Sequence, residues 1–122
     1  MVLCLAVRAS FIQLHLFASR WARLGLDDEA TRQLENEMMQ NPSAAPIVRG
    51  TGGARKIRFA PASWHSGKSG SVRVIYAFFD QFKTVVLITA YGKNEKANIT
   101  DGEAHTIKTM LEITVRRLRG ES

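Results

Sequence analysis

The protein has 122 residues, and 45% of them are hydrophobic, which is enough for one packed domain and too much for a disordered chain. Lysine and arginine number 17 against 11 aspartate and glutamate residues, and the formal net charge of +6 favours a polyanionic partner such as nucleic acid. The single cysteine, Cys4, excludes an internal disulfide and indicates a reducing, cytoplasmic environment.

The first element in chain order is predicted to be a strand over residues 9–16. Apolar residues fill every second position from Ile12 to Leu16, which is the pattern of a strand with one buried face. The apolar stretch before it, residues 1–8, is too short for a signal-peptide core or a membrane-spanning helix. We interpret it as an N-terminal extension or an early strand of a single domain that covers residues 1–122.

Two helices are predicted next, packed as a hairpin against one face of the sheet. Phe17, Trp21 and Leu24 recur at helical spacing, and the glycine that follows them is suited to end a helix. The second helix is predicted to begin at Asp27 or Asp28, because acidic side chains favour the positive end of the helix dipole. An Asn-Pro dipeptide ends it.

Three antiparallel strands are predicted in the middle of the chain. Runs rich in valine, isoleucine, phenylalanine and tyrosine cover Lys56–Ala60, Val72–Phe79 and Thr84–Tyr91. The break at Asp80–Gln81 is short, which predicts that the last two runs form a hairpin. The glycines of Gly50–Gly53, ahead of the first run, indicate a tight turn with positive φ rather than a phosphate cradle.

Positive charge is concentrated on these strands without negative charge nearby in the sequence. No acidic residue occurs between Asn41 and Phe79. The cations of this segment are Arg49, Arg55, Lys56, Arg58, Lys68 and Arg73. A sheet that carries cations without local anions is suited to bind a polyanion.

The last element is predicted to be a helix that follows Thr100 and ends near Arg119. Thr100 and Glu103 have the spacing of a capping box, and arginines in the last turn favour the negative end of the helix dipole. The predicted order is therefore β-α-α-β-β-β-α. This is an α+β domain with a mostly antiparallel sheet, an N-terminal helical hairpin and a C-terminal helix.

The cationic residues suit cleavage of RNA by its own 2′-hydroxyl group. This reaction needs a base for the 2′ proton, an acid for the leaving 5′ oxygen and stabilisation of a phosphorane, and it requires no metal ion. Lys56 and Arg58 share a face of their strand, and Arg73 on the neighbouring strand is expected opposite them. We assign Arg73 to the phosphate, because its planar fork binds two oxygens. Lys56 or Arg58 is assigned to positioning, and Lys56 or Lys93 to proton transfer.

No metal or cofactor is expected, because no set of cysteines and histidines has metal-ligand spacing. His65 lies between the first two strands of the meander and is interpreted as an exposed loop histidine, with a role as catalytic base as the alternative. The segment Gly67–Gly70 lacks the preceding spacing and the strand-to-helix context of a P-loop, so we reject that interpretation.

Three linked motifs run through this part of the chain: GTGGARKIRFA from Gly50, GKSGSVRVIY from Gly67 and AYGKNEKANIT from Ala90. Together they resemble the RelE/ParE toxin superfamily, and most closely its HigB-type branch. The strong likeness covers Gly50–Thr100, and the order of elements fits the remainder more loosely.

The resemblance implies a toxin of a bacterial type II toxin–antitoxin pair that enters the ribosomal A site and cuts mRNA there. It implies mRNA, the ribosome with its rRNA, and a cognate antitoxin as partners. In HigB-type pairs the antitoxin usually carries a helix-turn-helix domain. Operator DNA is then bound only through the complex. No membrane is involved.

The resemblance also implies site residues. The two basic residues that the family carries on the first meander strand correspond to Lys56 and Arg58, and the arginine that opens the next strand corresponds to Arg73. We expect Arg55 and Lys68 to bind RNA or the ribosome beside them.

Two departures from the RelE pattern follow the last strand. Asn94 stands where RelE has an arginine, and Thr100 stands where it has a tyrosine. Lys93 or Lys96 is expected to replace the lost cation. We place Lys93 with the catalytic residues and Lys96 with the RNA- and ribosome-binding ones.

Two other functions remain open from the sequence. A ParE-like toxin keeps the same fold and poisons DNA gyrase through protein contacts, but such toxins generally lack the basic residues found here. A non-catalytic nucleic-acid-binding module would bind RNA or DNA in a salt-dependent way without arresting growth.

Overall fold

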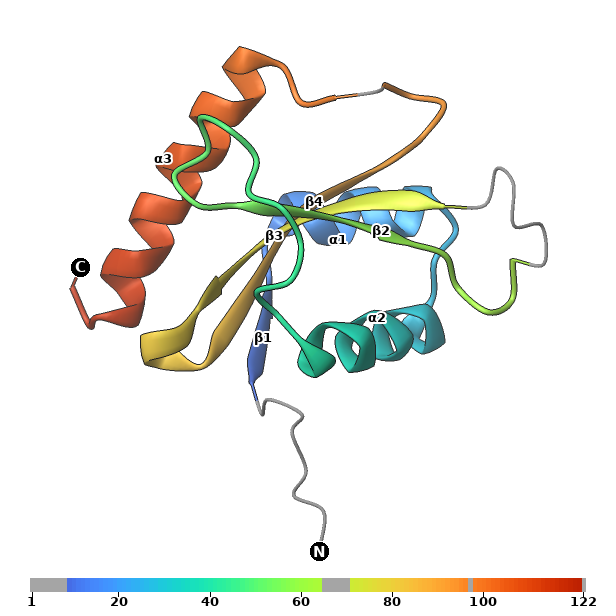
Figure 1. Ribbon diagram of the computed structural model, residues 1–122, viewed down its shortest axis with the longest axis horizontal. Coiled ribbons are helices and arrows are strands. Elements are labelled where there is room, and N and C mark those ends of the chain that lie inside the picture. The colour runs from blue at the N-terminus through green and yellow to red at the C-terminus, as the bar shows by residue number, and fades with distance from the viewer. Residues whose placement is uncertain (1–8, 65–70, 97, 122) are drawn as a thin grey trace, which may run out of the picture.

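The computed structural model describes residues 9–64, 71–96 and 98–121, which form an α+β domain (Figure 1). The elements, in chain order, are β1 (Ser10–Gln13), α1 (His15–Arg23), α2 (Asp28–Gln40), β2 (Arg55–Phe59), β3 (Val72–Phe79), β4 (Thr84–Gly92) and α3 (Asp101–Leu118). The order β-α-α-β-β-β-α predicted from the sequence is confirmed. None of the helices in these ranges has the length and apolar character needed to cross a bilayer.

The four strands form one mixed sheet in the order β1-β4-β3-β2. The β2–β3 and β3–β4 pairs are antiparallel, and β1 adds to β4 in parallel at one edge. The predicted hairpin between β3 and β4 is present, with a short 3-10 turn over Asp80–Phe82. Because β3 and β4 lie in the middle of the sheet, β4 is buried along nearly its whole length.

The pairing of β3 with β4 contains a one-residue shift. Ile75 pairs with Thr89, whereas its neighbour Tyr76 pairs with Leu87, so Ile88 has no partner opposite it on β3. An extra residue in one strand is a β-bulge, and it reverses which face the following residues of that strand present.

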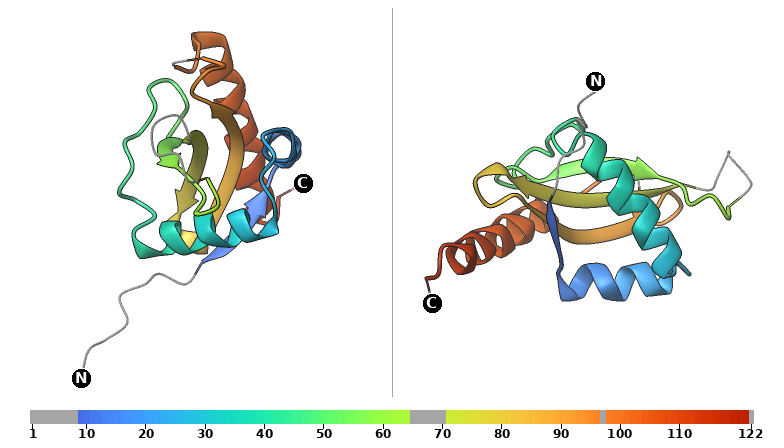
Figure 2. Two further views of the ribbon diagram at one scale, coloured as in Figure 1. Left: turned by 90° about the vertical axis from the view of Figure 1, so that its right-hand side faces the viewer. Right: turned by 90° about the horizontal axis from the view of Figure 1, so that it is seen from below.

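Helices cover both faces of the sheet (Figure 2). On one face, α1 and α2 pack on β3 and β4 through a core that includes Phe17, Leu34 and Val74. On the other face, α3 contributes Ile107 and Leu111 to a second core. The hydrophobic effect of burying both faces holds this three-layer arrangement together.

The helical hairpin forms on one face as the sequence predicts. The Asp27 side chain accepts a hydrogen bond of 2.9 Å from the backbone N–H of Ala30 and so caps the start of α2. The Trp21 indole donates to Thr31 Oγ1 at 2.9 Å, which ties α1 to α2. Gly25, just after α1, has a φ of +78°, which is the left-handed conformation expected of a residue that ends a helix.

The predicted first strand, residues 9–16, is too long. The strand ends at Gln13, and α1 already begins at His15. Leu16, which alternation places on a buried face, is exposed on the helix surface. The physical reason is that Phe17, Trp21 and Leu24 have helical spacing, and packing of that helical face on the sheet outweighs a local alternation of only eight residues.

The connector between α2 and β2 ends in the tight turn predicted at Gly50–Gly53. The φ values of Gly50, Gly52 and Gly53 are +82°, +74° and +118°, which only glycine adopts without strain. Buried Thr51 stabilises the turn, because its hydroxyl donates to the Val48 carbonyl at 2.7 Å. The turn packs on α3: a Cβ at Gly52 would lie 3.2 Å from the Lys108 side chain.

A capping box begins α3, as predicted. The Thr100 hydroxyl accepts from the Glu103 backbone N–H at 3.1 Å, and the Glu103 carboxylate accepts from the Thr100 N–H at 2.9 Å.

Thr100→Ala is expected to lower the free energy of unfolding by about 1 kcal/mol, measured by urea denaturation. Thr106→Ala, at an exposed position inside the same helix, is the control. Equal unfolding midpoints for the two variants would show that the cap contributes nothing.

Candidate nucleic-acid interface

A row of polar side chains crosses three strands on the α3 face of the sheet. Arg58 on β2 pairs with Arg73 on β3, and Arg73 pairs with Tyr91 on β4. Residues paired directly across a sheet point to the same side, and neighbouring strands lie about 4.8 Å apart. Tyr91 packs with the residues of α3, which fixes the face of the whole row. The opposition of Arg58 and Arg73 expected from the sequence is therefore present.

Lys56 extends this row along β2. It pairs with Ile75, two residues from the Arg58–Arg73 pair, and its side chain is half-buried. Lys56 lines two neighbouring hollows. One, with a volume of about 560 Å³, is also lined by Arg58 and Arg73. The other, of about 710 Å³, is also lined by Arg49 and by His105 of α3.

The guanidinium of Arg73 is half-buried and donates to Ser71 Oγ at 2.9 Å. Within residues 9–64, 71–96 and 98–121, no ion pair joins Lys56, Arg58 or Arg73 to a carboxylate. Three cations on one face without bound carboxylates leave their charge available to an anion from outside the protein. We call Lys56, Arg58 and Arg73 the cationic row.

Carboxylates from α3 border the cationic row, although none is near it in the sequence. Asp101 lines the hollow of Lys56 and His105. The Lys96 ammonium forms an ion pair with the Glu103 carboxylate and donates a hydrogen bond to it. This hydrogen bond is the main reason that the pKa of the Glu103 carboxyl lies below its usual range. The segment between Asn41 and Phe79, which contains no acidic residue, is therefore brought near carboxylates by the tertiary fold. The sequence did not predict this proximity.

Lys96 is engaged with residues of the protein. Its Nζ lies 5.1 Å from the centroid of the Tyr91 ring, a cation–π contact, in addition to the ion pair with Glu103. Lys93 lies in the exposed turn after β4, which a hydrogen bond of 2.8 Å from the Gly92 N–H to the Glu95 carboxylate closes. Of the two lysines expected to replace the lost cation, Lys96 is the one that contacts Tyr91, the cross-strand partner of Arg73.

Arg55 points to the opposite side of β2. It pairs with Tyr76 of the α1–α2 face, and its guanidinium donates to the carbonyls of Ser43 and Ala45 at 2.8 and 2.7 Å. These bonds fasten the connector to β2, which leaves Arg55 apart from the cationic row. The other predicted residues, Lys68 and His65, lie outside the described residues.

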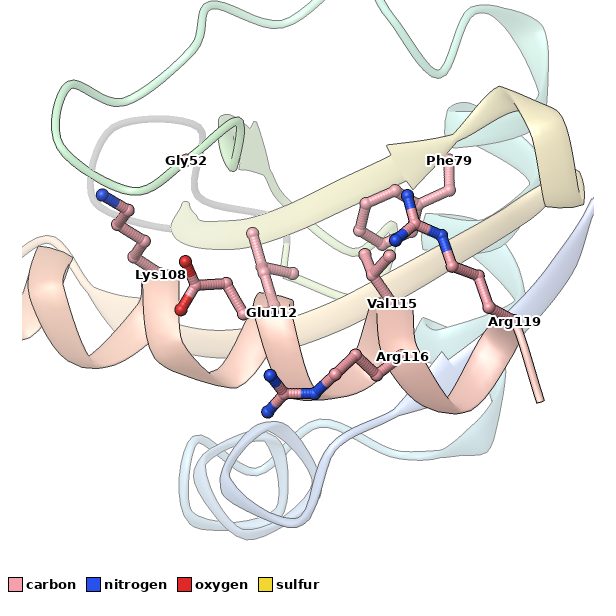
Figure 3. Close-up of a pocket in the computed structure, with 8 residues that line it drawn as sticks. Gly52, Phe79, Lys108, Glu112, Val115, Arg116 and Arg119 are labelled. Atoms are coloured by element: carbon pink, nitrogen blue, oxygen red, sulfur yellow. The ribbon is translucent and has the colours of Figure 1, made fainter. Parts of the chain in front are cut away.

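A separate groove of about 600 Å³ lies between the end of β3 and the C-terminal half of α3. Figure 3 shows Phe79 and Val115 within it and the charged ends of Lys108, Glu112 and Arg119 around them. An apolar floor with a mainly cationic rim is a surface suited to an acidic, partly apolar segment.

No family model matches the sequence. By structure the chain is similar to a mutant of the E. coli toxin RelE in the free state, with a TM-score of 0.53 and 17% sequence identity over 84% of this chain and 96% of that one. The chain has the RelE fold. A second structure, the isolated E. coli RelE toxin, has 18% identity over 84% of this chain and 99% of its own, with a TM-score of 0.48.

This similarity confirms the RelE-like fold expected from the three motifs, and the HigB-type branch stays a prediction. On the RelE-like sheet, the sequence identified the cations but not Tyr91. Tyr91 lies an even number of positions after Val85 and Leu87, and those two side chains face α1 and α2. Strict alternation along β4 would therefore place Tyr91 on the α1–α2 face, whereas it lies on the α3 face. Only the shift at Ile88 brings Tyr91 beside Arg73.

Proposed function

We propose that the protein is the toxin of a type II toxin–antitoxin pair, of the HigB type, and an endoribonuclease that cuts mRNA in the ribosomal A site. The observation that carries this proposal is the cationic row on the α3 face of a RelE-like sheet. It presents Arg58 and Arg73 directly opposite each other with Lys56 beside them, and no carboxylate of the described residues forms an ion pair with any of the three.

The cationic row and Lys93 supply the groups needed to cleave the RNA backbone by attack of its own 2′-hydroxyl group. Arg73, in the middle of the sheet, binds the scissile phosphate and stabilises the extra negative charge of the phosphorane through two parallel N–H donors. Lys56 or Arg58 holds the neighbouring backbone. Lys56 or Lys93, in its neutral form, takes the 2′ proton, and the resulting ammonium donates a proton to the leaving 5′ oxygen. None of these steps requires a metal ion.

The runner-up is a ParE-like toxin that poisons DNA gyrase. That function needs a protein-binding surface but no charged row on the sheet. Induction of the gene in bacteria separates the two: primer extension on a cellular mRNA is expected to show new 5′ ends within codons, and a gyrase supercoiling assay is expected to show no inhibition. Gyrase inhibition with intact mRNA would overturn the proposal. Growth without arrest would favour a non-catalytic binding module.

The antitoxin encoded beside this toxin is expected to bind through an acidic segment. The cationic row and the groove beside α3 both offer positive charge, and the groove adds apolar contacts. Electrostatic steering should make the association rate fall about 10- to 100-fold between about 50 and about 500 mM salt, measured by stopped-flow mixing. A rate that does not change over this range would remove the electrostatic part of the proposal.

A further inference from the structure

The hydroxyl of Tyr91 is a buried polar group without a hydrogen-bond partner among the described residues. The side chain is only 1% exposed. A buried donor without a partner destabilises the folded state, so folded proteins retain such groups mainly where they serve a purpose.

Tyr76 provides the comparison within the same sheet. It is buried to the same extent, on the neighbouring strand, but it faces α1 and α2. Its hydroxyl donates to the Pro42 carbonyl at 2.8 Å. Of these two buried tyrosines, Tyr76 is therefore hydrogen-bonded, whereas Tyr91, on the face of the cationic row, has no partner within residues 9–64, 71–96 and 98–121.

The surroundings of the Tyr91 hydroxyl are those of an anion site. Arg73 is the cross-strand partner of Tyr91, and the Lys96 ammonium lies 5.1 Å from the centroid of the Tyr91 ring. Burial raises the pKa of the Tyr91 phenol, the positive charge of Arg73 opposes that rise and the negative charge of Glu103 adds to it. The phenol therefore keeps its proton near neutral pH, and toward an acceptor it serves as a hydrogen-bond donor.

We propose that Tyr91 is a further substrate-contacting residue, whose hydroxyl donates a hydrogen bond to a non-bridging oxygen of the phosphate held by Arg73. The inference rests on the proposed ribonuclease function. No bond to Tyr91 forms or breaks: the proton stays on the phenol, and the phosphate oxygen is the acceptor that the described part of the chain does not provide.

Access to the hydroxyl depends on the long cationic side chains next to it. Lys96 is held over the ring by its ion pair with Glu103, and Arg73 is held by a single hydrogen bond to Ser71. A phosphate attracts both cations and competes with Glu103 for Lys96. We expect a bound phosphate to shift both side chains and so to open a path to the Tyr91 hydroxyl.

The test compares Tyr91→Phe with the matched control Tyr76→Phe, since each removes one buried hydroxyl. In urea denaturation, Tyr91→Phe is expected to be as stable as the unmodified protein or more so, whereas Tyr76→Phe should lose about fivefold in the folding equilibrium constant. In mRNA cleavage on programmed ribosomes, Tyr91→Phe should lose about 10- to 100-fold in kcat and Tyr76→Phe should cleave normally. A purely structural role predicts a parallel loss of stability and activity in each variant.

A second readout does not depend on cleavage. Inorganic phosphate, compared with sodium chloride at matched ionic strength, should stabilise the unmodified protein and Tyr76→Phe more than Tyr91→Phe. If the unmodified protein cleaves mRNA and Tyr91→Phe cleaves equally well, the role of Tyr91 is wrong and the proposed function stands. If the unmodified protein is inert on ribosomes but phosphate still distinguishes the two variants, the function is wrong and the anion site stands. Identical phosphate responses in both variants would overturn the site.

Discussion

Arg73→Ala is expected to lower the rate of mRNA cleavage by about 10²–10³-fold and to abolish growth arrest, with the fold intact. Arg73 lies between Arg58 and Tyr91 in the row of polar residues that crosses the sheet, which places it at the centre of the proposed phosphate site. Its one hydrogen bond recorded within the described residues goes to Ser71, so its removal leaves no buried carboxylate unpaired. The rate is measured by primer extension on programmed ribosomes.

Two further variants separate the geometry of Arg73 from its charge. Arg73→Lys keeps the charge and loses the planar fork, and it should retain only part of the activity. Arg23→Ala removes the same charge from an exposed position on α1 and should cleave normally. Growth arrest by Arg73→Ala at the normal rate, with equal protein levels, would contradict the assignment of the phosphate site.

Purified protein is expected to leave naked mRNA essentially intact and to cut it within codons once programmed ribosomes are added. Lysine and arginine side chains are almost fully protonated at neutral pH, so little free base is available, and proton transfer contributes only about 10²–10⁴-fold. The larger contribution must come from holding the 2′ oxygen in line with the phosphate. The hollows beside the row are open and shallow, which suits docking on an RNA that the ribosome already holds in place.

The control is Arg73→Ala on the same ribosomes, which distinguishes cleavage by this protein from a contaminating ribonuclease. Equal cleavage rates with and without ribosomes would point to a free-standing ribonuclease. In that case a better-placed base than Lys56 or Lys93 would have to exist.

The sequence predicted the fold well because most of its signals were local. The capping box at Thr100, the glycines of Gly50–Gly53 and the β-rich runs each determine a few residues of structure. The shared face of Lys56 and Arg58 followed from their spacing alone. These features need no knowledge of which elements touch.

The rest of the site depends on contacts between distant segments, which spacing does not encode. Arg55 sits in the same charged run as Lys56, yet its guanidinium is bound by carbonyls of the connector on the other face. Asp101 lines the same hollow as Lys56, which lies 45 positions earlier in the sequence, because α3 packs across the sheet. The absence of acidic residues from one stretch of sequence therefore does not mean that the surface formed by that stretch has no carboxylates beside it.

The unpaired Ile88 affects how this chain must be compared with others of its fold. An alignment that places β4 strands residue against residue, without a gap, assumes that equal distance from Thr84 means equal orientation. In a strand that lacks the extra residue, the position equivalent to Ala90 faces the α3 side and the position equivalent to Tyr91 faces α1 and α2. Substrate-contacting positions in this part of related chains should therefore be matched by their cross-strand partner on β3, with Arg73 as the reference point, and a gap should be allowed at residue 88.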